Sequence, residues 1–414
     1  MPVPVNGDPD LSLLRERAAR ELTDDILPFW EERAFDGDGW LVGAVLDDLT
    51  VVDDRPRHAV LAARILWTFA AAMRDLPDEA TRWERTARKA LNLVVDRFWD
   101  SERGGVFWSL APDGSVESDR KQVYAQAFAI YALAQWHEVS ADAEALECAW
   151  QVFDHLEASA RDRDYGGYHE VLTRSWEPLG GTALSEKDLA VPKSMNTNLH
   201  VLEAYTTLLR VTGDGRVRES LASLLRTALE HIVADDPWTH CSLFFDREWR
   251  SQIATISYGH DIEASWLLWD AWEALSAAGV KDAVLAGETR RVTLALADAV
   301  RVHGLDADGG VMYEGNPAGI TVPHKHWWPQ AEGVVGWLNA YQLDGRAADR
   351  DAALAVWDFI DEHVIDHVNG EWFAELERDG SVRSHAPDEC KIGPWKCPYH
   401  NGRTALEVMR RVRE

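Results

Sequence analysis

The chain has 414 residues, 46% hydrophobic and 27% charged, a composition typical of globular proteins and far from that of disordered ones. Its formal net charge of −28 would repel nucleic acid, anionic lipid and any phosphorylated ligand that lacks a local basic pocket. The composition therefore argues against nucleic-acid and membrane partners and favours a neutral ligand.

The N-terminal residues 1–20 contain no basic segment followed by an apolar one, so we expect no signal peptide. No apolar run approaches the length that spans a bilayer. The four cysteines form no Cys-x-x-Cys pair, and a chain of this length does not need a disulfide framework. We expect a cytoplasmic protein with reduced thiols.

Glycine-centred turns followed by alternating aromatic residues recur along the chain. Five of them carry the full pattern: FDGDGWLVG (35–43), SERGGVFWSL (101–110), RDYGGYHEV (163–171), DADGGVMYEG (306–315) and VNGEWFAEL (368–376). A sixth, HCSLFFDREW (240–249), keeps the aromatic alternation but has neither a glycine pair nor a single glycine, and it lies near the middle of the longest gap. Self-similarity at a regular spacing marks a repeat architecture, here of six units.

Between these turns the pattern is helical. Apolar residues recur at i, i+3, i+4 and i+7 over residues 57–73, 121–136 and 198–211. Each unit has room for two helices, and six helical hairpins can close into an (α/α)6 barrel, with inner helices surrounded by outer ones. Closure lets a long chain share one core, so we predict an all-α single domain over residues 1–414, with short strands at the turns on one face. An open solenoid would need polar end units, which the sequence lacks.

The chain contains 20 tryptophans against 9 tyrosines and 11 phenylalanines. Core packing accounts for most of them, but it rarely requires so many, because each buried indole N–H needs a hydrogen-bond partner. Sugars have apolar C–H faces that stack on indole and hydroxyls that form hydrogen bonds. The tryptophans therefore favour a saccharide ligand.

The first candidate stretch for a site is KSMNTNLHVLEAYT (193–206). Asn196, Thr197 or Asn198 could cap a helix that begins there. His200 would then lie in the first turn, with Glu203 three residues further on.

A second stretch, ISYGHDIEASWLLWDAWEAL (256–275), pairs a histidine with a glutamate. We expect Gly259 to break the chain and a helix to start at His260 or Asp261. Glu263 follows His260 by three positions, so the two share a helix face, and Glu263 could orient His260 and raise its basicity. An ordinary capping histidine or a metal ligand would show the same spacing.

A third stretch, HKHWWPQAEGVVGW (324–337), is rich in tryptophan. Trp327 and Trp328 precede a helix that Pro329 can open at its first turn. Their indoles would lie at the mouth of the barrel, where helix ends line a pocket.

The fourth stretch is GPWKCPYHNGR (393–403). It places His400 among aromatic, amide and guanidinium side chains, namely Trp395, Tyr399, Asn401 and Arg403. Cys390, Cys397, His385 and His400 could be drawn as a zinc site, but their spacing matches no common zinc pattern, and we predict no metal.

Together these stretches suit acid/base chemistry on a neutral polyol. Histidine is the side chain best suited to removing and returning a proton near neutral pH, which points to a reaction next to a carbonyl group. Glycoside hydrolysis would need two carboxylates across a pocket, and acidic residues are abundant enough to keep it as an alternative.

At these residues the chain resembles the N-acylglucosamine 2-epimerase superfamily and, within it, the cellobiose 2-epimerases. The resemblance extends through nearly the whole chain. It covers ARILWTF (63–69), YGGYHEV (165–171), KSMNTNLHVLEAYT (193–206), SYGHDIEASWLL (257–268), WWPQAEGVVG (327–336) and GPWKCPYHNGR (393–403). It implies an (α/α)6 barrel that epimerises C2 of a reducing-end glucose to give mannose, with no redox cofactor and no required metal.

The resemblance also implies roles for individual residues. His260 and His400 look like the two acid/bases, one on each side of C2, and Glu263 looks like the residue that holds His260. Arg64 and His200 look like the groups that bind the oxygens near C1 and C2 and stabilise a cis-enediolate. The contacts to the sugar ring and its hydroxyls would come from Asn196, Tyr124, Trp328 and Trp395.

Two departures from the family pattern leave the substrate open. Cellobiose 2-epimerases tend to carry Lys-Gly ahead of the arginine-bearing helix, whereas this chain reads DRPRHAVLAAR (54–64), and its first turn lacks a glycine pair. A D-mannose 2-epimerase or a D-mannose isomerase acting on monosaccharides is therefore the alternative, and an (α/α)6 glycoside hydrolase is a remote one. We expect a neutral mono- or disaccharide substrate and a monomer or weak homodimer.

Overall fold

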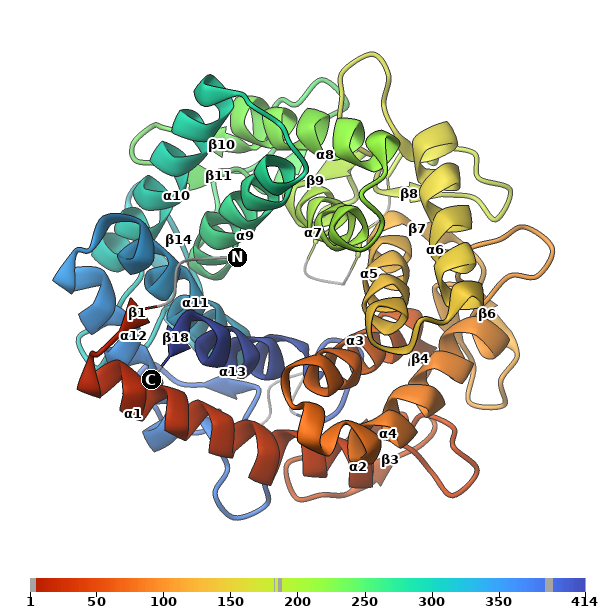
Figure 1. Ribbon diagram of the computed structural model, residues 1–414, viewed down its shortest axis with the longest axis horizontal. Coiled ribbons are helices and arrows are strands. Elements are labelled where there is room, and N and C mark those ends of the chain that lie inside the picture. The colour runs from red at the N-terminus through yellow and green to blue at the C-terminus, as the bar shows by residue number, and fades with distance from the viewer. Residues whose placement is uncertain (1–4, 182, 185–187, 384–389, 414) are drawn as a thin grey trace.

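The computed structural model describes residues 5–181, 183–184, 188–383 and 390–413. It consists of two concentric rings of helices (Figure 1). The helices of the inner ring are α3 (Ala59–Asp75), α5 (Val123–Ser140), α7 (Met195–Thr212), α9 (Tyr258–Ala277), α11 (Trp327–Asp344) and α13 (Tyr399–Arg411). Those of the outer ring are α1 (Pro9–Arg20), α2 (Leu27–Arg33), α4 (Ala80–Asn92), α6 (Ala143–His155), α8 (Gly215–Thr227), α10 (Ala283–His303) and α12 (Ala347–Phe359).

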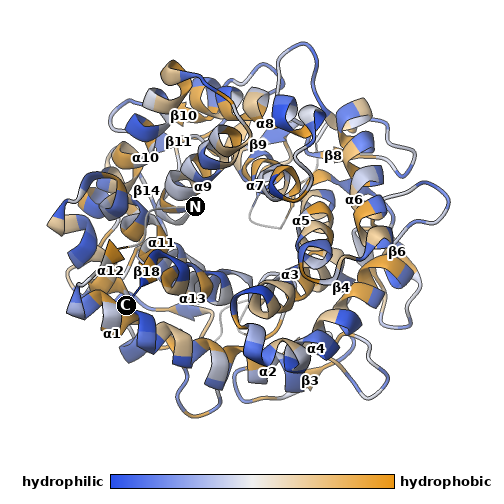
Figure 2. Cartoon of the chain, in the orientation of Figure 1, coloured by the Kyte–Doolittle hydropathy of each residue, from blue (hydrophilic) through white to orange (hydrophobic). Residues whose placement is uncertain are grey.

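Burial separates the two rings. In α3, every residue from Ala59 to Ala72 is buried, and α5 is buried from Val123 to Trp136, as expected for helices that are covered on all sides. The outer helices bury one face and expose the other, so polar residues dominate the rim of the molecule (Figure 2). None of the described helices is both long enough and apolar enough to cross a bilayer.

The ring is closed, which confirms the predicted (α/α)6 barrel and excludes the open solenoid. Helix α13 packs against both α3 and α11, so the last inner helix contacts the first. At the mouth, a bridge between Val45 and Ile392 joins the first unit to the last. On the other side of the molecule, β1 (Val5–Asn6) pairs in parallel with β18 (Val412–Arg413).

Short strands connect neighbouring units around the mouth. The strand directly before each of the inner helices α3, α5, α7, α9 and α11 pairs antiparallel with a strand of the following unit. These pairs are β4 (Arg57–His58) with β5 (Ser109–Leu110), β7 (Lys121–Gln122) with β8 (Val171–Leu172), β9 (Lys193–Ser194) with β12 (Phe244–Phe245), β13 (Ile256–Ser257) with β14 (Glu314–Asn316), and β16 (Lys325–His326) with β17 (Glu375–Leu376). The remaining strands are β2 (Ala44–Val45), β3 (Val51–Val52), β6 (Val116–Ser118), β10 (Val233–Ala234), β11 (His240–Cys241) and β15 (Gly319–Val322).

The six turns found in the sequence connect the end of an outer helix to these strands. Gly167 has φ +67°, and a Cβ there would lie 2.4 Å from the Trp249 ring and 2.9 Å from Asn198 Oδ1, so only glycine fits. The fourth unit, which lacks the glycine pair, closes its turn with the β10–β11 pair instead. The repeat therefore corresponds to six structural units.

A buried lysine in each of three strands ties a unit to the turn beside it. Lys121 Nζ lies 3.1 Å from Asp100, and Lys193 Nζ lies 3.1 Å from Asp162. Lys325 contacts Asp308 in the same way. All three lysine side chains are fully buried, so these ion pairs hold the mouth in one arrangement.

Three predicted helix starts are displaced. The structure caps α7 with the side chain of Ser194, not with Asn196 or its neighbours, and this places His200 in the second turn. Ser257 caps α9, which begins at Tyr258 before the predicted start. Helix α11 begins at Trp327, ahead of Pro329. In each case a short strand runs directly into the helix, which leaves no loop for a later start.

Candidate active site

Each inner helix contributes a predicted site residue close to its N-terminal end. Five of the inner helices follow directly from a strand at the mouth, and α13 begins shortly after the Val45–Ile392 bridge there, so all of these ends lie on the same side of the barrel. The residues are Arg64 on α3, Tyr124 on α5, His200 on α7, His260 on α9, Trp328 on α11 and His400 on α13. The helix N-termini carry partial positive charge, so this end of the barrel favours a bound group that becomes negative.

His200 is held by a buried carboxylate. Its Nδ1 lies 2.9 Å from Glu203 Oε2, and no partner among the described residues contacts its Nε2. Glu203 also accepts hydrogen bonds from Tyr399 Oη, at 2.5 Å, and from Arg403. Burial lowers the pKa of His200 despite the opposing effect of Glu203. A neutral imidazole fixed at Nδ1 can present Nε2 to a ligand.

His400 lies above a pair of buried glutamates. Its Nδ1 is 2.6 Å from Glu332 Oε1 and 3.9 Å from Glu263 Oε1. Arg403 donates to both carboxylates, at 2.7 Å to Glu263 and 2.6 Å to Glu332. Trp266 Nε1 donates to the other oxygen of Glu332 at 2.9 Å.

Burial dominates the electrostatics of this group. It lowers the pKa of His400 well below its ordinary value, and the charges of Arg64 and Arg403 lower it further. Burial and the neighbouring Glu332 raise the pKa of Glu263 to about 8, so Glu263 carries a proton at neutral pH. The imidazole therefore rests neutral above a carboxyl pair that can stabilise an added proton.

The predicted contact between Glu263 and His260 is wrong. His260 Nδ1 lies 2.9 Å from Ser257 Oγ, the hydroxyl that also caps α9, whereas Glu263 contacts Arg403 beneath His400. Spacing of i, i+3 puts two side chains on one helix face, but a buried carboxyl pairs with the nearest strong donor, here a guanidinium. Burial and the nearby His200 lower the pKa of His260 to about 3.

Trp328 brings the two predicted acid/bases together. The centre of its ring system lies 4.8 Å from that of His260 and 5.6 Å from that of His400. Both imidazoles therefore pack against the same half-buried indole, and they lie in one site, not in separate cavities.

Arg64 is a buried cation without a carboxylate partner among the described residues. Its guanidinium donates to Tyr124 Oη at 2.6 Å and contacts Cys397 Sγ at 3.5 Å. It also lies 4.3 Å from the ring centre of Phe128. An uncompensated buried charge is costly unless it serves a function, and binding a negative oxygen would satisfy it.

The remaining predicted residues line the entrance. Tyr124 packs edge-on against His200 and lies 5.9 Å from Trp395 between ring centres. Trp395 and Asn196 are half-buried, and Asn196 Oδ1 is a buried oxygen without a hydrogen-bond partner. A half-buried indole and an unpaired amide oxygen both suit a sugar, which offers an apolar face and hydroxyl donors.

The zinc arrangement drawn from the sequence does not form among the described residues. Cys397 faces Arg64, His400 is bonded to Glu332, and His385 lies outside the described residues. In the described part of the chain, one group of side chains has the spacing of metal ligands: Glu263, Glu332 and His400. Arg403 already occupies both of those carboxylates, so the group does not fit a cation.

Sequence reasoning missed Glu332, Arg403 and Ser257 as functional residues. Glu332 had a signal, since a glutamate interrupts the apolar run of AEGVVGW, and a buried carboxylate needs a partner. Ser257 had one too, because a serine three residues ahead of a histidine at a helix start is a typical N-cap. The role of Arg403 could not be predicted from the residues around it in the sequence, because its carboxylate partners lie on three other helices.

Comparisons with known proteins agree on one family. The family model described as N-acylglucosamine 2-epimerase matches residues 43–393. The cellobiose 2-epimerase of Bacteroides fragilis is 41% identical over 402 residues, which cover 96% of this chain and 99% of the relative. The structure of cellobiose 2-epimerase from Bacillus thermoamylovorans superposes with a TM-score of 0.89 at 34% identity, covering 97% of this chain and all of the other. A D-mannose isomerase of Marinomonas mediterranea is 22% identical and is covered over 94% of its length.

Proposed function

The chain belongs to the N-acylglucosamine 2-epimerase family, and from this premise we propose that it is an aldose 2-epimerase of the cellobiose 2-epimerase kind. It interconverts glucose and mannose at the reducing end of a β-1,4-linked disaccharide. The observation that carries the proposal is the packing of His260 and His400 against the single indole of Trp328, with the unpaired cation Arg64 in the same site.

The reaction begins with the open-chain sugar, whose aldehyde acidifies the proton on C2. One imidazole, neutral because it is buried, removes this proton as a general base. The electrons left on C2 delocalise onto the oxygens of C1 and C2 and form a cis-enediolate. Arg64 and the Nε2 of His200 stabilise its negative charge.

Inversion requires a proton to reach C2 from the other side. The second imidazole donates it and therefore enters the step protonated, while the proton taken from C2 stays on the first imidazole, so the reverse reaction exchanges the two roles. The pair thus holds one proton before the step and one after it, and it takes up that proton from solvent to form the reactive state. Glu332 accepts the Nδ1–H of His400 and stabilises the imidazolium, whereas His260 is held by a neutral hydroxyl.

The entrance residues position the sugar. Asn196 Oδ1 accepts a hydroxyl hydrogen, and Trp328 and Trp395 stack on sugar faces. The relatives more than 30% identical are named as disaccharide epimerases, whereas the D-mannose isomerase relative is much more distant, and this favours the disaccharide. The single domain over 1–414, the cytoplasmic location and the monomeric or weakly dimeric state stay predictions.

The proposal is tested by incubating the protein with cellobiose, lactose or mannose in heavy water, with a chelator present, and analysing the sugars. Deuterium at C2 together with a mannosyl product is expected. Fructose would instead indicate isomerisation with transfer to C1, and glucose released from cellobiose would indicate hydrolysis. A double variant that replaces both His260 and His400 with Gln is the control and should give no labelled product.

A further inference from the structure

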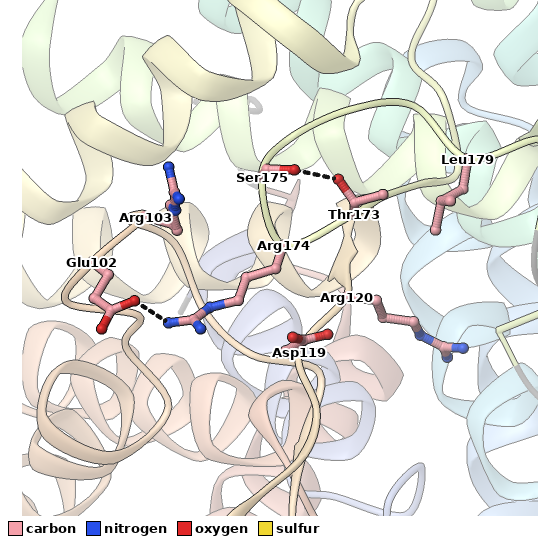
Figure 3. Close-up of a pocket in the computed structure, with 8 residues that line it drawn as sticks. All are labelled: Glu102, Arg103, Asp119, Arg120, Thr173, Arg174, Ser175 and Leu179. Carbon is pink, nitrogen blue, oxygen red and sulfur yellow. Dashed lines mark hydrogen bonds and ion pairs between the residues drawn. The ribbon is translucent and has the colours of Figure 1, made fainter.

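A polar cavity of about 450 Å³ opens at the mouth beside the second and third units (Figure 3). Its walls come from the turn after α4, the residues before β7 and the turn after β8: Glu102, Arg103, Asp119, Arg120, Thr173, Arg174, Ser175 and Leu179. A smaller depression of about 320 Å³ shares Asp119 and Arg174 with it. No residue of the proposed catalytic set lines either one.

A line of aromatic rings connects this cavity to the candidate active site. The Arg120 guanidinium lies 4.8 Å from the ring centre of Trp108. Trp108 lies 6.2 Å from Trp395, and Trp395 lies 5.9 Å from Tyr124, which packs against His200. A saccharide stacked on Trp395 would therefore reach Arg120 with its next ring or with a substituent on C6.

Arg120 forms no ion pair with a described residue, and the one carboxyl group that attracts it at longer range is that of the buried Glu170. Arg174 is neutralised by Asp100 and Glu102, but Arg120 pairs with no carboxylate among the described residues. Its Nε is buried without a hydrogen-bond partner. Figure 3 shows its side chain directed away from Asp119 and Arg174, on the same side of the cavity as Leu179.

The nature of this charge points to an anionic ligand. A guanidinium presents a planar fork that matches a carboxylate, and a half-buried cation gains more from a charged partner than from a hydroxyl. The chain as a whole has a net charge of −28, which repels acids unless a local basic pocket receives them. Arg120 supplies such a pocket beside the sugar-binding aromatics.

We propose that this cavity is a distal subsite for a carboxylate-bearing sugar, a uronic acid unit on the non-reducing side of the epimerised glucose, with Arg120 pairing its carboxylate. Thr173 and Ser175 offer hydroxyls to the same sugar, and Leu179 offers apolar surface. The proposal rests on the proposed function, since it concerns the substrate of that reaction.

The test compares three substrates: cellobiose, cellotriose and the disaccharide in which glucuronic acid replaces the non-reducing glucose of cellobiose. For each, kcat/KM is measured from deuterium incorporation at C2. The wild type should prefer the acidic disaccharide to cellobiose, and added salt should reduce the preference. In Arg120→Gln the acidic-to-neutral ratio should fall by about tenfold or more, and Arg120→Lys should retain part of it.

Arg163→Gln is the matched control, because it removes the same charge from an exposed position in the neighbouring turn. It should leave the ratio unchanged. If Arg120→Gln lowers kcat/KM for all three substrates equally, or for cellotriose alone, the carboxylate subsite is wrong. If the wild type epimerises no substrate, the proposed function itself fails, whatever Arg120 does. Thermal unfolding of each variant identifies any that does not fold.

Discussion

At the scale of single residues, the three histidines of the site share one arrangement. Each is held at Nδ1, His200 by Glu203, His400 by Glu332 and His260 by the hydroxyl of Ser257. A ring fixed at one nitrogen has a defined tautomer and orientation and presents the other nitrogen to the substrate. The partners differ in charge, so the imidazoles differ in how well they keep an added proton.

Replacing either His260 or His400 should separate proton removal on one face of C2 from proton return on the other face. In His260→Gln and in His400→Gln we expect kcat for epimerisation to fall at least about a hundredfold, because one face of C2 loses its proton carrier. The remaining imidazole still faces one side, so each variant should exchange deuterium into C2 of one epimer only, measured by NMR in heavy water. His367→Gln, an exposed histidine on the rim, is the control. Either variant keeping most of its kcat would refute the assignment.

The two glutamates under His400 should respond differently to the same substitution. Glu332→Gln removes the charge that stabilises the His400 imidazolium, so kcat should fall about ten- to a hundredfold with little change in KM. Glu263 carries a proton at neutral pH, since its pKa is raised to about 8, and glutamine imitates that state. Glu263→Gln should therefore keep most of its activity at pH 7. Equal losses in both variants would contradict these roles.

At the scale of secondary-structure elements, the start of α9 has two functions. Ser257 Oγ accepts the hydrogen bond that caps the helix and also contacts Nδ1 of His260. The short strand β13 runs straight into α9, so the cap and the catalytic ring are positioned by the same hydroxyl. Correct capping and correct orientation of His260 are thus coupled.

Ser257→Ala should lose both effects. We expect a loss of about 1 kcal/mol in the free energy of unfolding from the missing cap and a fall in kcat of roughly tenfold from a loosened His260. Asp214→Ala removes the cap of the outer helix α8 and should cost similar stability without changing kcat. Ser257→Thr should restore activity. Urea unfolding and steady-state kinetics on all three separate the two contributions.

How far the sequence predicts the structure can also be judged on these elements. Apolar periodicity located α3, α5 and α7 to within a few residues, because buried helices leave long apolar runs. The starts of α7 and α9 were misplaced, because they were predicted from capping residues. The asparagines near α7 and the glycine near α9 are as typical of a helix start as the serines that cap these helices. The role of Glu263 was wrong, because spacing along one helix does not show which neighbouring helix supplies the better partner. Arg403 joins four helices, and no local pattern contains that information.

At the scale of the whole molecule, six inner helices direct their positive ends to one mouth, and the reaction takes place there. The six-unit repeat was enough to predict this ring, because a repeat that buries one face of every unit must close or carry caps. Burial that keeps the histidines neutral also makes the fold sensitive to acid. His200, His260 and His400 all have pKa values lowered by burial.

Stability should therefore fall as the pH drops below the ordinary histidine pKa. The folded state keeps His260 neutral down to a pKa of about 3, whereas the unfolded chain takes up the proton near pH 6.5. Between these values the unfolded state binds more protons, so His260 alone costs up to about 1.4 kcal/mol per pH unit as the pH falls. Urea midpoints from pH 7 to pH 4 should decline more steeply for the wild type than for His260→Gln. Parallel curves would show that the imidazole accepts a proton in the folded state.

The ring is closed by the bridge between Val45 and Ile392 and by the contacts of α13 with α3 and α11. Each inner helix therefore packs against two inner neighbours, and no inner helix forms an exposed end of the ring. A break at the tight turn after α9, at Gly279, would divide the molecule into a piece with Arg64, His200 and His260 and a piece with Glu332, His400 and Arg403. Neither piece has a complete proton relay. Epimerisation would then appear only when the two pieces are mixed and reassemble into one ring. The barrel could thus serve as a split reporter, in which a change in the stereochemistry of the sugar measures reassembly.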